Sequence, residues 1–156
     1  MSIKTYIESD EFRLFLDESL RQNACNAVEK FLDSHEHIDN VQLHSIPGVI
    51  QGGGMAGFKD LVEKQKKRNT KLRNKKFWEF LHGLVFATPG SEYSLRSFIA
   101  AQPRIQDLLK DETEASDKKG QKQIRKANKV LVEEVITYVL PIYFEHFNCH
   151  YFYMNR

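Results

Sequence analysis

The sequence has few cysteines, no long hydrophobic run and no recognisable catalytic motif. Its two cysteines, Cys25 and Cys149, lie far apart, so a disulfide framework is not expected. The first residues contain no apolar signal-peptide core, and no stretch approaches the roughly 18 apolar residues that a membrane span requires. We therefore expect a cytoplasmic protein that does not contact a membrane.

Internal repeats and domain boundaries are also missing from the 156 residues. A chain of this length fits one domain and is long enough to bury a core. Apolar residues make up 41% and charged residues 28%, which is typical of a globular protein and excludes a disordered one. We expect a single helical domain over residues 1–156.

Apolar residues recur at helical spacing along most of the chain. From Phe12 to Leu32 they return every three or four residues behind a helix start at Ser9, which predicts a helix over about residues 10–34. Further helices are predicted from Phe58, over Phe77–Phe86, around Leu95–Ile99, from Pro103, and from about Gln121 onward. Together they predict an all-α bundle of about five to seven helices with a basic surface.

Proline, glycine and polar runs mark where the predicted helices end. Residues 34–51 are predicted to form a connector, and Gly52–Gly57 a flexible turn. Residues 111–120 have no apolar anchor and predict an exposed loop. Pro141 is expected to kink or break the last helix, and the β-branched and aromatic run 135–144 also allows a strand there.

The formal net charge is only +2, but the charges are unevenly distributed. Residues 1–40 hold nine acidic and four basic side chains, whereas residues 64–76 hold eight basic side chains and no acidic one. Like charges at this density repel one another unless an anion relieves them, and a nucleic-acid backbone does so while releasing counterions. The predicted nucleic-acid-binding residues of this segment are Lys64, Lys66, Lys67, Arg68, Lys71, Arg73, Lys75 and Lys76.

A second basic set begins the last predicted helix. Lys122, Arg125, Lys126 and Lys129 share one helix face and are also predicted to bind nucleic acid. If the two sets converge in space they form a groove, with Trp78 as a stacking surface. A solvated face balanced by the acidic amino-terminal helix, or an acidic protein partner, is the alternative.

The aromatic carboxyl-terminal residues support a different function. Their number exceeds what one helix stripe buries, so some are expected to contact a neighbouring subunit, by self-association or in a larger assembly. The predicted partner-binding residues are Phe147, Tyr151, Phe152 and Tyr153. This hypothesis describes a helical adaptor or scaffold. A carboxyl-terminal helix packed wholly into its own core is the competing interpretation.

Two short patterns are weak signals. Gly52–Gly57 matches a dinucleotide-binding glycine pattern, but a lysine-rich segment follows where an acidic residue and a second strand are needed, so a hinge is favoured. His146, Cys149 and His150 share a helix face, yet no second ligand cluster accompanies them. We predict no catalytic residue, no cofactor and no metal, and hence no enzyme.

A pattern of residues between positions 21 and 85 resembles a known family. Arg21, Ala24 and Ala27 precede Ile46-Pro47 and Ile50, followed by Gly53 or Gly54, Phe58, a lysine-rich helix end, Trp78 and Leu81. This order resembles the small helical subunit of Cmr-type (type III-B) CRISPR effector complexes, which has Asn-Gly where this chain has Gly-Gly. The likeness covers under half of the chain. It implies a non-catalytic subunit of an antiviral ribonucleoprotein that lines a guide–target duplex, and it favours RNA over DNA.

Overall fold

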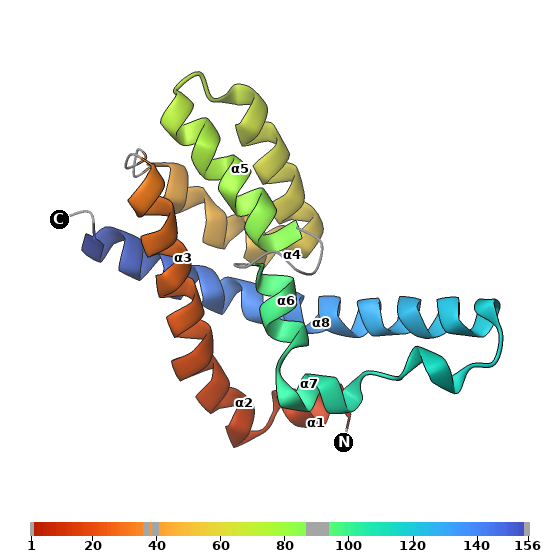
Figure 1. Cartoon of the computed structure of the whole chain (residues 1–156). Coiled ribbons are helices and arrows are strands. Elements are labelled where there is room, and N and C mark those ends of the chain that lie inside the picture. Colours follow the sequence, from red (N-terminus) through yellow and green to blue (C-terminus); the bar gives the residue numbers. More distant parts are fainter. Residues whose placement is uncertain (1, 36–37, 39–40, 87–93, 155–156) are drawn as a thin grey trace.

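The computed structural model describes residues 2–35, 38, 41–86 and 94–154, and within these ranges it contains helices and no strand. The all-α prediction is therefore confirmed. The elements are α1 (Ile3–Ile7), α2 (Asp10–Leu14), the π-helix η1 (Phe15–Leu20), α3 (Arg21–Ser34), α4 (Val41–Arg68), α5 (Leu72–Phe86), α6 (Leu95–Ala100), α7 (Pro103–Leu108), the 3₁₀-helix η2 (Glu112–Glu114) and α8 (Lys118–Met154). Figure 1 shows their arrangement.

The first long helical run confirms the prediction for residues 10–34. It consists of α2, η1 and α3 in direct succession, with a π-helical segment between two α-helical ones. Its start is capped by Ser9, whose Oγ accepts a hydrogen bond from the Phe12 N–H at 3.1 Å, as the sequence predicted. Its apolar stripe, including Ala24, Val28 and Phe31, is fully buried and packs on α8.

The predicted connector 34–51 is wrong for its second half, because helix α4 begins at Val41. Leu43, Ile46 and Ile50 recur at helical spacing and are buried in the core, so tertiary packing outweighs the local penalty of Pro47. The predicted glycine turn is a kink within α4. Gly54 has φ 60° and ψ −148°, a conformation that is available to glycine and strained for other residues.

Helix α8 runs for 37 residues without interruption, so neither the predicted break at Pro141 nor the strand occurs. Val139, Leu140, Tyr143, Phe144 and Phe147 are fully buried at helical spacing on both sides of the proline. These side chains pack against α3 and α4, and their burial holds the helix together through Pro141. The first half of α8 projects away from the other helices (Figure 1).

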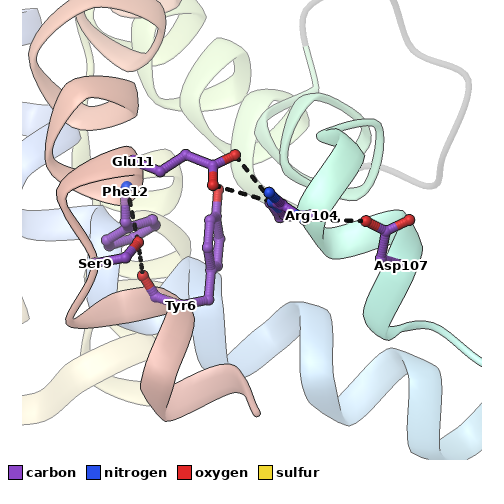
Figure 2. A network of polar contacts seen from close by, with 6 residues as sticks. All are labelled: Tyr6, Ser9, Glu11, Phe12, Arg104 and Asp107. Carbon is purple, nitrogen blue, oxygen red and sulfur yellow. Dashed lines mark hydrogen bonds and ion pairs between the residues drawn. The ribbon is translucent and has the colours of Figure 1, made fainter. Parts of the chain in front are cut away.

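Helix α7 is fixed to the amino-terminal helices by a polar network (Figure 2). Arg104 Nε donates to both carboxylate oxygens of Glu11, at 3.0 and 3.2 Å, and Arg104 Nη1 lies 3.8 Å from Asp107 Oδ2. Ser9 Oγ donates to the Tyr6 carbonyl at 2.6 Å, which joins α1 to α2. Burial and the neighbouring Glu11 raise the pKa of the Tyr6 hydroxyl. At this end of the molecule, the Arg104 guanidinium is therefore paired with carboxylates of the same chain.

Candidate nucleic-acid interface

Residues 64–76 lie at the tip of a helical hairpin made of α4 and α5, here called the basic hairpin (Figure 1). The last buried apolar residue of α4 is Val62, so the final turn of that helix extends past the core. Asn69 then ends the helix: its Nδ2 donates to the Gln65 carbonyl at 2.7 Å and to Gln65 Oε1 at 3.0 Å. Helix α4 therefore extends to Arg68.

Most cationic side chains of the basic hairpin face solvent. Among the described residues, no ion pair joins a carboxylate to Lys64, Lys66, Lys67, Arg68, Lys75 or Lys76. Lys66 is half-buried and Arg73 is half-buried, whereas the other six predicted residues of the segment are exposed. The hairpin therefore presents several positive charges that the described carboxylates leave uncompensated.

The basic hairpin also forms one side of a groove of about 810 Å³. The other side is the end of α3, which contributes Ser34 and His35. The His35 ring stacks on Phe31, with ring centroids 4.6 Å apart and planes 3° apart. Ser34 and His35 lie about 35 positions before the hairpin residues of this groove in the sequence. No local pattern marks them, so the sequence did not identify them. The groove is lined by Ser34, His35, Lys71, Leu72, Arg73 and Lys76.

Arg73 is half-buried and lies near Tyr151 of α8. It lies close enough to Tyr151 to lower the pKa of that hydroxyl, although burial raises the Tyr151 pKa overall. The Tyr151 hydroxyl accepts a hydrogen bond from the Ile38 N–H at 2.7 Å. This contact ties the last turns of α8 to the chain that follows α3, behind the groove.

His82 lies on α5 and is half-buried. Burial lowers the pKa of its imidazole, and the charges of Lys66 and Lys59 lower it further, while Glu63 acts in the opposite direction. The ring packs on Phe86 at a centroid distance of 5.4 Å. Lys66 of the basic hairpin therefore contributes to the low pKa of His82, after burial.

Trp78 does not provide the predicted stacking surface. Its side chain is fully buried and packs edge-on against Phe77, with ring centroids 5.5 Å apart. The periodicity of α5 turns Phe77, Trp78 and Leu81 toward the core and leaves the lysines outside. Bases therefore cannot stack on Trp78, and positive charge is the dominant feature of this surface.

The second basic set does not converge with the first. Figure 1 places the start of α8 at one extremity of the molecule and the tip of the basic hairpin at another. Arg125 also has a partner, because its Nε and Nη2 donate to the Glu112 carboxylate at 2.9 and 3.1 Å. This pair lowers the pKa of Glu112 and raises that of Arg125. Lys122, Lys126 and Lys129 are exposed on the same helix.

The predicted aromatic contact surface is wrong for Phe147 and Tyr151. Both side chains are fully buried within this chain, where they pack near Phe77 at centroid distances of 6.2 and 6.3 Å. The long apolar run of α8 is buried by several helices, including α3, α4 and α6, which accommodate more aromatic rings than one stripe on one partner would. Phe152 is half-buried, and Tyr153 is exposed.

The histidines near the carboxyl terminus are bound within the fold. His146 Nε2 lies 3.2 Å from the Leu16 carbonyl oxygen, and His150 Nε2 lies 3.1 Å from Glu29 Oε1. Within the described ranges, no cluster of three or more histidine, cysteine or acidic side chains has a geometry suited to a metal ion. Cys25 is half-buried, and burial raises its pKa, which disfavours the reactive thiolate.

No family model, curated protein or solved structure matches this chain. None of the helices that the structure describes combines the length and hydropathy needed to cross a bilayer.

Proposed function

We propose that this protein binds nucleic acid without sequence preference through the basic hairpin. The supporting observation is a set of five exposed cations that form no ion pair with a carboxylate among the described residues: Lys64, Lys67, Arg68, Lys75 and Lys76. Repulsion among them is relieved when a polyanion approaches, and released counterions add to the binding free energy.

The groove beside the hairpin offers a recess in which part of the nucleic-acid backbone can bind. A phosphate that enters it meets Lys71, which precedes α5, and Lys76 of α5, and the imidazole of His35 from the opposite side. Hydroxyl and imidazole groups supply additional hydrogen bonds to phosphate or sugar oxygens, which position a strand without reading its bases. The ligand class is therefore a single strand or a duplex held by its backbone, with RNA as the first choice.

The protein acts, in this proposal, as a non-catalytic subunit of a larger ribonucleoprotein assembly. The resemblance of residues 21–85 to the Cmr-type small subunit implies the same role. Exposed apolar side chains outside the hairpin, among them Leu14 at 57% and Tyr153 at 62% exposure, offer contacts for neighbouring subunits.

A charge-matched pair of variants tests the proposal. Lys64→Gln, Lys67→Gln and Arg68→Gln together should weaken binding of a mixed-sequence RNA of about 20 nucleotides by roughly 10- to 100-fold and reduce the salt dependence. The control combines Lys4→Gln, Arg13→Gln and Arg21→Gln, which removes the same charge from exposed sites on the amino-terminal helices. Equal losses in both variants, measured by fluorescence anisotropy at several salt concentrations, would contradict a localised site.

A further inference from the structure

The segment between α7 and α8 folds back along the projecting half of α8 (Figure 1). Residues 110–117 of this segment are called the acidic strap, because they include Asp111, Glu112, Glu114 and Asp117. The strap thus places carboxylates beside a helix whose exposed side chains are mostly lysine and arginine. A polyanion bound to this helix would likewise place negative charges beside its lysines and arginines.

Several directed contacts hold the acidic strap on α8, including a hydrogen bond at 3.4 Å from Gln121 Nε2 to the Ala115 carbonyl. Both oxygens of Glu112 accept from the Arg125 guanidinium, at 2.9 and 3.1 Å. The Asn128 amide brackets the Lys110 backbone: Lys110 N–H donates to Asn128 Oδ1 at 3.0 Å, and Asn128 Nδ2 donates to the Lys110 carbonyl at 2.8 Å. At the far end, Asp117 Oδ1 accepts from the Gly120 N–H at 2.7 Å.

These contacts are exposed, and so they are weak and reversible. The Arg125 and Glu112 side chains are 67% and 40% exposed, and exposed ion pairs of this kind contribute little and are screened by salt. None of residues 110–117 is buried. The strap is therefore held by polar contacts that another anion can replace.

The acidic strap borders a continuous basic face. Lys118, Lys122, Arg125 and Lys129 follow one another at steps of four, three and four residues, which places them on one side of α8. All four are exposed, and Arg125 is the one that the strap engages. A nucleic-acid backbone that lies along this face must compete with Glu112 for the Arg125 guanidinium.

We infer that the acidic strap is an intramolecular competitor that engages Arg125 on the basic face of α8, and that nucleic acid displaces it on binding there. This inference rests on the proposed function and adds to it a second surface, on which Arg125 is already engaged. The mechanism is an exchange of one charge-assisted hydrogen-bonded pair for another, with no change in the helical core.

Two variants that each remove one negative charge distinguish a competing strap from a general effect of net charge on RNA binding. Glu112→Gln removes the carboxylate that binds Arg125, and Glu114→Gln removes an exposed carboxylate that has no ion pair among the described residues. Glu112→Gln should raise the affinity for the RNA about two- to fivefold more than Glu114→Gln does. Arg125→Gln in the Glu112→Gln background should remove the gain. Equal affinities of the two single variants would overturn the inference.

An uncharged variant provides an independent test. A Cβ at Gly120 would lie 2.7 Å from Asp117 Oδ1 and 2.9 Å from the Ala115 Cβ, so Gly120→Ala must push the strap away from α8. Gly83→Ala in α5 is the control, because nothing lies within 4 Å of the added Cβ there. Only Gly120→Ala should increase RNA affinity. No increase in that variant would contradict the strap as a competitor.

Hydrogen exchange in the wild-type protein distinguishes the two possible failures. If the strap is displaced, the amides of residues 110–117 should exchange faster when RNA is bound. If RNA binds and these amides slow down or stay unchanged, the strap is a brace for α8 and only the further inference fails. If the wild-type protein binds no RNA, or if the basic-hairpin variant binds RNA as tightly as the wild type, the proposed function fails and the inference fails with it.

Discussion

The basic hairpin and the projecting half of α8 have similar charge but different surroundings. Among the described residues, no ion pair joins a carboxylate to the exposed hairpin cations Lys64, Lys67, Arg68, Lys75 and Lys76, whereas Arg125 of α8 is bound by Glu112 of the acidic strap. A run of lysines and arginines in a sequence therefore does not reveal which of them are available. Availability depends on whether the fold returns an acidic segment to the same surface.

The two regions also differ in how they are anchored. The hairpin tip continues directly into Phe77, Trp78 and Leu81, which are fully buried in the core. The beginning of α8 has exposed Val130 and is contacted by the acidic strap, which includes η2. The hairpin is thus anchored directly in the core, whereas the beginning of α8 depends on weaker, exposed contacts.

The largest expected difference concerns stability. Phe77→Ala should lower the free energy of unfolding by about 3–5 kcal/mol, because the ring packs against Phe31, Trp78 and Phe147 in the core. Val130→Ala, at the beginning of α8, should change it by less than about 0.5 kcal/mol. Urea unfolding followed by circular dichroism measures both. Similar losses would show that the beginning of α8 is anchored as firmly as the hairpin.

Single charge removals should give an intermediate effect. Lys67→Gln should weaken RNA binding about three- to tenfold and lower the salt slope by about one, because this exposed side chain contacts phosphate in our proposal. Arg125→Gln should weaken binding less than about twofold, since the lost phosphate contact is offset by the pair with Glu112 that no longer has to break. A larger loss for Arg125→Gln would reverse the comparison between the two regions.

The smallest expected effect is on the pH dependence of binding. Burial and the neighbouring lysines lower the pKa of His82 in the free protein, so its imidazole is neutral near pH 7. A phosphate close to Lys66 would raise that pKa, and binding would then take up a proton. Affinity should therefore increase as the pH falls from about 7.5 to about 6.

His82→Gln is the control for this effect, since it removes the titrating group and keeps a polar side chain. Its affinity should vary less over the same pH interval than that of the wild-type protein. An identical pH profile in the two proteins would mean that His82 does not sense the bound anion, and would weaken the assignment of the hairpin as the binding site.

Much of the fold was predictable because amphipathic periodicity is a local property. The helix over residues 10–34, its Ser9 cap and the short helices near Leu95 and Pro103 all follow from residue spacing, and all are present. The errors occurred where distant residues decide. Local rules assign Pro47 and Pro141 as helix breakers, but burial of the apolar residues around each proline keeps α4 and α8 helical.

The candidate site shows the same division. The sequence determined that residues 64–76 carry eight positive charges past the end of an apolar stripe, since charge and spacing are intrinsic to the chain. Only the tertiary structure decided that Trp78, Phe147 and Tyr151 are buried, that His35 faces the hairpin across a groove, and that Glu112 meets Arg125. These outcomes depend on how helices far apart in sequence pack together, and packing is set by contacts that no local pattern specifies.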